Sequence, residues 1–230
     1  MTEERESLRS GIKLLGLSAT VGQENQLLAY LTELEEANRS FNLTRIARDE
    51  FVTLHLLDSL AALRALPDSP NLRVLDIGTG AGFPGVPIAA LLPGSSVTLL
   101  DSTGKKVRFA VAAAQKSGLA NVLGIHGRAE MLGQTEGYRE SFDAVTSRAV
   151  APFGTLVEWM LPLVRIGGVA VALKGTGYRE EMEGCEALVS RLGGGKPQVH
   201  SLLLPNTGIE RFVISIPKVA STPKTFPRSK

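Results

Sequence analysis

The sequence predicts an α/β fold built on a mostly parallel sheet of seven strands. From residue 72 onward, short runs of β-branched and aliphatic residues alternate with helical segments, which is the order of a parallel sheet with right-handed crossovers. The last two strand-like runs, 198–205 and 211–218, are joined only by "NTGIE", which leaves no room for a helix. We expect them to form an antiparallel hairpin at one edge of the sheet. The residues before 72 are predicted to add a helical extension at the N-terminus.

This N-terminal extension, residues 1–68, is predicted to be a helical layer packed on the main domain, residues 69–218. Leucines recur at helical spacing in 23–41 and again in 48–66. The segment "PDSPN" then breaks the pattern, so the junction between layer and domain is placed there. A basic tail, residues 219–230, completes the chain.

The main domain is expected to contain five strands before the hairpin, with helices between them. The strands are predicted at 72–77, 96–101, 122–126, 143–147 and 168–174, and the helices near 85–92, 104–117, 153–164 and 178–192. Five alternating units followed by a terminal hairpin are typical of the Rossmann-like class I methyltransferases.

The composition indicates an ordered protein of a reducing compartment. Hydrophobic residues make up 43% of the chain and charged residues 21%, with a mean hydropathy of +0.10. No run approaches the ~18 to 20 apolar residues of a membrane span, and the N-terminus lacks the features of a targeting peptide. The single cysteine, Cys185, cannot form an internal disulfide. We therefore expect a cytoplasmic monomer without membrane association.

Residues 73–94, "RVLDIGTGAGFPGVPIAALLPG", contain two overlapping glycine patterns. Gly80, Gly82 and Gly85 make the GxGxxG of dinucleotide-binding sites. Read from Asp76, the same stretch is DxGxGxG, which suits S-adenosylmethionine. In both interpretations the glycines let the chain turn tightly after the first strand and approach a ligand at a helix N-terminus.

The register of this loop favours S-adenosylmethionine. The apolar strand ends at Gly78, so a dinucleotide motif that begins at Gly80 would start two residues late. Pro84 and Pro87 suit a first helical turn but remove N–H donors that a pyrophosphate needs. S-adenosylmethionine has no pyrophosphate, so a methyl-donor site is the favoured interpretation.

Two acids belong to the same predicted site. Asp76 lies at the end of a buried strand, where a carboxylate is costly unless it is paired, and we expect it to meet a methionine ammonium and the loop amides. Asp101 closes the second strand, where its carboxylate can accept hydrogen bonds from both ribose hydroxyls. Asp101 would serve either cofactor and does not discriminate between them.

Three further motifs accompany the loop: "HLLDSL" at 55–60, "SRAVAPF" at 147–153 and "ALKG" at 172–175. With these, the chain from about Phe41 to Lys218 resembles the bacterial small-subunit ribosomal RNA guanine-N7 methyltransferases, also called glucose-inhibited division protein B. The resemblance implies S-adenosylmethionine as methyl donor. It also implies one guanine N7 of 16S rRNA, near the decoding centre of the small ribosomal subunit, as acceptor.

The resemblance also implies site residues, transferred motif by motif. The cofactor contacts are Gly78 and Phe83 of "GTGAGF", Asp101, Ser102 and Thr103 of "LLDST", Ala129 and Glu130 of "GRAE", and Arg148 of "SRAV". Asp76, Gly80 and Gly82 complete the predicted cofactor site.

The predicted chemistry needs positioning more than proton transfer. Guanine N7 carries an in-plane lone pair and needs no deprotonation, so no general base is expected. Arg148 and Lys174 each end a strand at the edge where open α/β sheets bind ligands, and both are predicted to act catalytically. The alternative for Arg148 is a structural ion pair with an acid such as Asp76 or Glu158.

Contacts with RNA are predicted for four cations: Arg128, Lys174, Lys224 and Arg228. The last two belong to the basic tail, whose charges would release counterions from phosphates. The alternative for the tail is a disordered, solvated terminus. His55 and Asp58 are three residues apart, which suits a hydrogen bond within one helix that closes the N-terminal layer over the pocket.

Two other classes of function remain open at this stage. One is an NAD-dependent oxidoreductase, for which no hydride-relay residue can be named. The other is a non-catalytic RNA-binding assembly factor, for which a degraded loop would be expected. The three histidines are scattered and no Cys/His cluster suggests a metal site.

Overall fold

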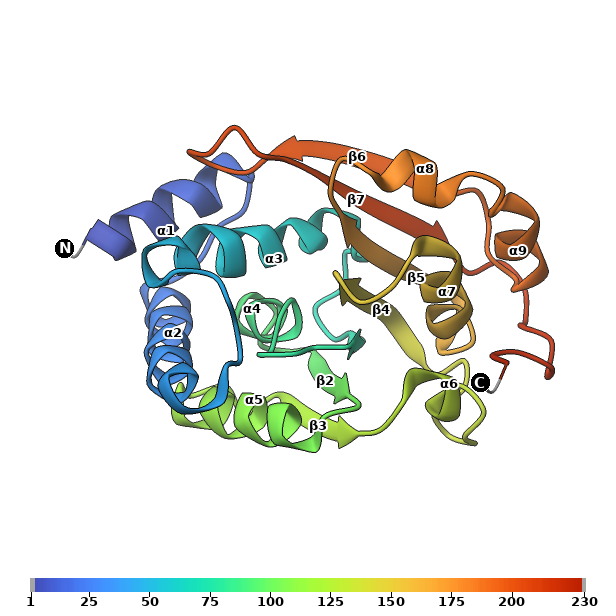
Figure 1. Cartoon of the computed structure of the whole chain (residues 1–230), viewed down its shortest axis with the longest axis horizontal. Coiled ribbons are helices and arrows are strands. Elements are labelled where there is room, and N and C mark those ends of the chain that lie inside the picture. The colour runs from blue at the N-terminus through green and yellow to red at the C-terminus, as the bar shows by residue number, and fades with distance from the viewer. Residues whose placement is uncertain (1–2, 229–230) are drawn as a thin grey trace.

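The computed structural model describes residues 3–228 and forms an α/β fold around one seven-stranded sheet (Figure 1). The strand order is β3-β2-β1-β4-β5-β7-β6. The bounds are Arg73–Ile77 (β1), Ser96–Asp101 (β2), Val122–His126 (β3), Phe142–Arg148 (β4), Val164–Lys174 (β5), Gln198–Leu203 (β6) and Glu210–Pro217 (β7). Strands β1 to β5 pair in parallel, while β7 runs antiparallel to β5 and to β6. The predicted sheet and hairpin are confirmed.

Residues 1, 2, 229 and 230 lie outside the described part of the chain. Lys230 of the predicted basic tail is among them. Within residues 3–228, no helix is long and apolar enough to span a bilayer.

Two predicted helices are shorter than expected because glycine and proline interrupt them. The helix predicted at 153–164 ends early as α7 (Phe153–Met160), since Pro162 has no N–H to continue it, and β5 starts at Val164. The helix predicted at 178–192 is split at Gly184, whose φ is +73°. The two pieces are α8 (Tyr178–Met182) and α9 (Glu186–Arg191). A short helix after β3, α6 (Ala129–Leu132), was not predicted.

The N-terminal layer packs on one face of the sheet together with α4 (Gly85–Leu91) and α5 (Gly104–Lys116) (Figure 1). It consists of α1 (Glu3–Leu14), α2 (Val21–Phe41) and a helical segment over 48–65. That segment changes from a 3-10 turn (48–50) to a π-helix (51–57), α3 (Asp58–Leu60) and a second 3-10 turn (61–65). Helices α6, α7, α8 and α9 lie on the opposite face, where a second core forms.

The start of α2 shows how this layer is fixed to the sheet. Thr20 and Gln23 form a capping box, in which the Thr20 hydroxyl accepts from the Gln23 main-chain N–H at 3.2 Å and the side-chain Oε1 of Gln23 accepts from Thr20 N–H at 2.8 Å. The Gln23 amide also donates to the carbonyl of Ala90 at the end of α4, at 2.9 Å. The fully buried Leu31 belongs to the same core as Val97 of β2. The layer and the sheet therefore share one hydrophobic core.

The topology brings distant segments to one edge of the sheet. The carboxyl ends of β1 to β5 meet there, and the chain order reverses between β1 and β4, which is where open α/β sheets bind ligands. Because β7 is antiparallel to β5, its first residues lie at this same edge.

Candidate active site

The loop after β1 is held to β2 by its own main chain. The N–H groups of Gly78 and Thr79 both donate to the carbonyl of Leu100, at 2.8 and 3.0 Å. The N–H of Gly80 donates to the Asp101 carboxylate at 2.9 Å. These donors are already bonded within the protein. The loop is therefore unlike a phosphate-binding loop, in which such N–H groups face the ligand.

The first turn of α4 offers no phosphate site either. Pro84 and Pro87 have no N–H, and Val86 donates to a loop carbonyl at 2.8 Å. The N–H of Gly85 donates to the carboxylate of Asp76 at 2.9 Å. The local geometry thus disfavours a dinucleotide pyrophosphate, in agreement with the register of the motif.

Asp76 lies behind the loop rather than in a ligand pocket. Its side chain is fully buried, accepts from Gly85 N–H and is contacted by the Thr146 hydroxyl at 3.3 Å. Burial raises the pKa of Asp76 to about 7, although the hydrogen bond from Gly85 opposes the rise. Asp76 therefore tethers the start of α4 to the end of β1.

A pocket opens in front of the loop, and five predicted cofactor residues line it: Gly78, Asp101, Ser102, Ala129 and Glu130. Val150 and Trp159 form apolar parts of its wall. The Asp101 oxygens accept the N–H groups of Gly80 and Thr103, at 2.9 and 2.8 Å. A carboxylate has about four acceptor positions, so Asp101 keeps capacity for ligand hydroxyls. We call this site the cofactor pocket, after the predicted cofactor residues that line it.

Three other predicted cofactor residues are found in the packing around the loop. Gly82 has φ +93°, and a Cβ there would lie 2.2 Å from the Tyr30 hydroxyl oxygen. That hydroxyl donates to the carbonyl of Ala81 at 2.8 Å, so α2 anchors the loop from the side. Phe83 is buried and stacks on His55 with a ring separation of 4.3 Å. Thr103 contributes its N–H to Asp101.

A second pocket lies at the same edge, beside the turn that follows β4. Its polar lining residues are Asp58, Arg148, Lys174 and Arg211. Ala149 lines this pocket and Val150 the cofactor pocket, so one turn contributes to both. Ala149 has φ +54°, a strained conformation for an L-residue that is often found at functional sites. We call this second site the acceptor pocket, after the role that we propose for it.

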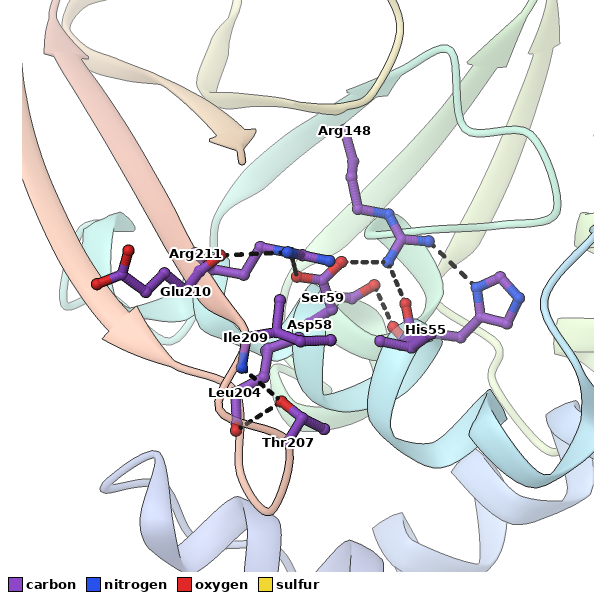
Figure 2. A network of polar contacts seen from close by, with 10 residues as sticks. His55, Asp58, Ser59, Arg148, Leu204, Thr207, Ile209, Glu210 and Arg211 are labelled. Atoms are coloured by element: carbon purple, nitrogen blue, oxygen red, sulfur yellow. Dashed lines mark hydrogen bonds and ion pairs between the residues drawn. The ribbon is translucent and has the colours of Figure 1, made fainter. Parts of the chain in front are cut away.

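Asp58 bridges two arginines in the acceptor pocket (Figure 2). Its Oδ2 accepts from Nη1 of Arg148 at 3.0 Å, and its Oδ1 accepts from Nε of Arg211 at 2.9 Å. Asp58 is almost completely buried, while Arg148 and Arg211 keep 15% and 26% of their side chains exposed toward the pocket. The network joins the N-terminal layer, β4 and the terminal hairpin. The proposed pairing of Arg148 with Asp76 or Glu158 was wrong, because the N-terminal layer supplies the partner acid.

His55 holds the other side of Arg148. Its Nδ1 lies 3.2 Å from Nη2 of Arg148 and its Nε2 lies 3.0 Å from the Thr44 hydroxyl. Burial, together with the charge of Arg148, lowers the pKa of His55 to about 3. The ring is therefore neutral, accepts from Arg148 and carries its proton on Nε2. The expected bond between His55 and Asp58 is replaced, since both side chains contact Arg148 instead.

Lys174 lines the acceptor pocket but is already engaged. Its Nζ donates to the carbonyl of Ala151 at 2.8 Å and to the Glu181 carboxylate at 2.5 Å. The side chain is 7% exposed. An RNA contact by Lys174 would require this pair to open.

The remaining predicted RNA contacts, Arg128, Lys224 and Arg228, are all exposed but differ in their partners. Arg128 lies on the rim of the cofactor pocket with 68% of its side chain exposed, at 3.7 Å from Glu130. Lys224 is exposed. Arg228 binds Glu158 through its guanidinium and its main-chain N–H. The described part of the tail is therefore packed on the protein, and the alternative of a disordered, solvated terminus is wrong for residues 219–228.

Comparison with known proteins identifies the group to which these features belong. The sequence profile of a family described as rRNA small subunit methyltransferase G matches residues 23–209. The chain belongs to the rRNA small subunit methyltransferase G family. A protein named Ribosomal RNA small subunit methyltransferase G from Alkaliphilus oremlandii is 39% identical over 98% of this chain and 95% of its own. A protein of the same name from Symbiobacterium thermophilum is 41% identical, with coverages of 99% and 95%.

A solved structure shares the fold. The crystal structure of a SAM-dependent O-methyltransferase from Thermotoga maritima has a TM-score of 0.55 at 14% identity, covering 84% of this chain and 72% of that one. Membership of the methyltransferase G family and the loop geometry together overturn the oxidoreductase alternative.

Sequence reasoning missed several site residues of this family member. Arg211 lies at the start of an antiparallel strand, and only the predicted hairpin direction could have placed it at the ligand edge. Trp159, on α7, lines the cofactor pocket without any motif to mark it. Asp58 was expected to serve its own helix, yet it bridges two distant arginines.

Proposed function

We propose that this protein, an S-adenosylmethionine-dependent small-subunit rRNA methyltransferase, methylates N7 of one guanine in 16S rRNA. The proposal is carried by the adjacency of two pockets at one sheet edge. One has acidic side chains in front of a glycine loop, and the other has three cations, Arg148, Lys174 and Arg211. The turn through Ala149 and Val150 contributes to both, so donor and acceptor would meet there.

The cofactor pocket suits S-adenosylmethionine, which supplies a methyl group on a positively charged sulfonium when bound. Asp101 would accept hydrogen bonds from the ribose hydroxyls. Ala129 and Glu130, at the start of α6, would lie beside the adenine. The acidic lining suits a ligand with a sulfonium and an ammonium, whereas it would repel a pyrophosphate.

The acceptor pocket supplies orientation rather than a base. N7 attacks through its own lone pair, and His55 is a weak base because its pKa is about 3. Arg148 is held by Asp58, His55 and the carbonyl of Leu54, so its direction is fixed before RNA binds. Its contact would be guanine O6 or a phosphate, since N7 must remain free. Holding two reactants in line can lower a barrier by about 7 to 11 kcal/mol.

The shape of RNA limits which guanines can be reached. N7 lies on the major-groove edge, which is deep and narrow in A-form helices. The target must therefore be unpaired or exposed in a loop or junction. We propose that the enzyme acts as a monomer in the cytoplasm, on 16S rRNA within or outside the small subunit.

A direct test uses 30S subunits and naked 16S rRNA from a strain that lacks a methyltransferase G. Each is incubated with the protein and radiolabelled S-adenosylmethionine, and N7-methylguanine is mapped by reductive cleavage. We expect label at a single guanine. If S-adenosylmethionine binds in calorimetry but no form of the RNA is labelled, the rRNA assignment is wrong and the assembly-factor alternative gains support.

A further inference from the structure

The chain after β7 crosses back over the protein as a strap, defined here as residues 219–228. Figure 1 shows this segment in red, running down past α9 to end beside α6. No residue of the strap lines the cofactor pocket. Yet α6 and α7, the two helices that the strap contacts near its end, both contribute residues to that pocket: Ala129, Glu130 and Trp159.

The strap is anchored where it begins. Lys218, just before it, is buried, and its Nζ donates to the carbonyls of Leu161 and Leu192, at 2.7 and 3.2 Å. Thr222 donates its N–H to Glu140 at 2.6 Å. The cationic Lys218 and the carboxylate of Glu140 are themselves 3.2 Å apart. Main-chain and side-chain bonds thus fix the first half of the strap.

Arg139 ties the strap to the end of α6. Its guanidinium donates to three strap carbonyls, those of Thr222, Pro223 and Phe226, at 2.8, 3.1 and 2.8 Å. It also donates to the carbonyl of Gly133, immediately after α6, at 2.6 Å. A planar guanidinium can hold several acceptors in a fixed geometry, which a flexible ammonium cannot do.

Packing brings the strap still closer to the same helix. Pro227 lies against Gly133, where an added Cβ would approach the proline ring to 2.9 Å. Phe226 is buried in the core that includes Ala129 and Leu132 of α6. Gln134 donates its side-chain amide to the carbonyl of Pro227 at 2.9 Å.

The last described residue reaches the other helix. Arg228 donates its main-chain N–H to Glu158 at 2.7 Å, and its guanidinium contacts both oxygens of that carboxylate. Glu158 precedes Trp159 on α7. The strap therefore joins the segment that carries Ala129 and Glu130 to the segment that carries Trp159.

We propose that the strap positions the adenine-side wall of the cofactor pocket, with Arg139 as the principal positioning residue. The inference rests on the proposed function, which assigns this pocket to S-adenosylmethionine. The tail thus acts on cofactor affinity through α6 and α7, in addition to any charge that it presents to RNA.

The test compares two full-length variants with a matched control. Arg139→Gln removes the guanidinium that donates hydrogen bonds to the strap. Gly133→Ala places a methyl group against Pro227 while raising helix propensity, so a weakened helix cannot explain its effect. Arg165→Gln is the control, because it removes an arginine that pairs with Asp143 at the opposite edge of the sheet. Trp159 is the single tryptophan of the chain and lines the cofactor pocket, so we expect its fluorescence to change when S-adenosylhomocysteine binds.

We expect S-adenosylhomocysteine to bind about five- to tenfold more weakly to both strap variants, with the control unchanged. The KM for RNA should change less than the affinity for S-adenosylhomocysteine, because the acceptor pocket is separate from the strap. Coupling is reciprocal, so S-adenosylhomocysteine should also slow amide hydrogen exchange across 219–228 in the unmodified protein. This last readout does not depend on the folding of any variant.

The outcomes separate the two proposals. If the unmodified protein does not bind S-adenosylhomocysteine, the cofactor assignment fails and the strap proposal fails with it. If it binds, but both variants keep full affinity and exchange in the strap does not change, the strap proposal alone is overturned.

Discussion

The two pockets at the carboxyl edge of the sheet are built in different ways. Main-chain bonds shape the cofactor pocket, where Gly78, Gly80 and Thr103 are bonded to the end of β2. Long side chains shape the acceptor pocket, where Arg148 and Arg211 meet on Asp58. A main-chain framework is rigid before its ligand arrives. A framework of paired side chains depends on the length and geometry of each side chain in it.

The acceptor pocket also keeps its cations oriented at modest net charge. One carboxylate serves two arginines, so this trio has a net charge of +1. Lys174 is neutralised by Glu181. Arg148 is held at one nitrogen by Asp58 and at another by His55. Its planar guanidinium therefore keeps its direction as well as its charge, and the pocket can attract RNA and still present Arg148 in one orientation. The difference between the pockets predicts that substitutions will separate cofactor binding from turnover.

The largest effect is expected from Gly82→Val, which disturbs the backbone conformation of the glycine loop. Any L-residue is strained at φ +93°, and the new side chain would overlap the Tyr30 hydroxyl. We expect binding of S-adenosylhomocysteine to weaken about 100-fold or more in calorimetry. Gly177→Ala, at an open position with φ −78°, is the matched control. Wild-type affinity in Gly82→Val would show that the loop is not the rigid element.

The second prediction concerns Arg148→Lys, which keeps the positive charge and removes the planar guanidinium. A lysine cannot hold Asp58, His55 and the Leu54 carbonyl together. We expect kcat/KM for RNA methylation to fall about 100-fold, with S-adenosylhomocysteine affinity changed less than about threefold. Arg165→Lys, at the opposite edge, should leave both unchanged. Equal losses of affinity and turnover would mean that Arg148 belongs to the cofactor pocket.

The smallest effect is a pH dependence of stability from Asp76→Asn. The pKa of Asp76 is about 7 in the folded protein and 3.8 ordinarily, so the folded state retains a proton that the unfolded state releases between these values. Its contribution to stability is complete below about pH 4 and is lost as the pH rises to about 7. The stability of the unmodified protein relative to Asp76→Asn should fall across this range in urea unfolding.

Asp143→Asn provides the control for that experiment. Although burial opposes it, hydrogen bonds from Arg73 N–H and Arg165 hold the pKa of Asp143 below its ordinary value. Its contribution is lost only as the pH falls below about 4, so no change is expected between about pH 5 and 7. If the stability of the unmodified protein relative to Asp76→Asn stays constant over the same range, Asp76 is ionised throughout.

Much of the fold followed from local pattern. Strands β2 and β3 begin and end at the predicted residues, because each is an aliphatic run whose ends are marked by turn residues. The antiparallel hairpin followed from the shortness of "NTGIE". The helix boundaries that failed, at Pro162 and Gly184, depend on where a helix is interrupted rather than on whether one forms. The strand predicted at 168–174 begins four residues earlier, at Val164.

The cofactor side of the site could be predicted because it is local in sequence. Asp101 ends a strand, while Gly78, Ser102, Ala129 and Glu130 follow one, and parallel strands bring such positions to one edge. Their place in the pocket is set by the order of strands, which the alternating pattern already indicates.

The partners of charged groups were decided only by the tertiary structure. Asp58 and Arg211 lie 153 residues apart, and a hydrogen bond joins them. The strap reaches Glu158 across 70 residues. The spacing of hydrophobic residues indicates which face of a helix or strand is buried. It does not indicate which of several acids will pair with a given arginine. Only the packing of the N-terminal layer, the hairpin and the strap on the sheet selects one of them.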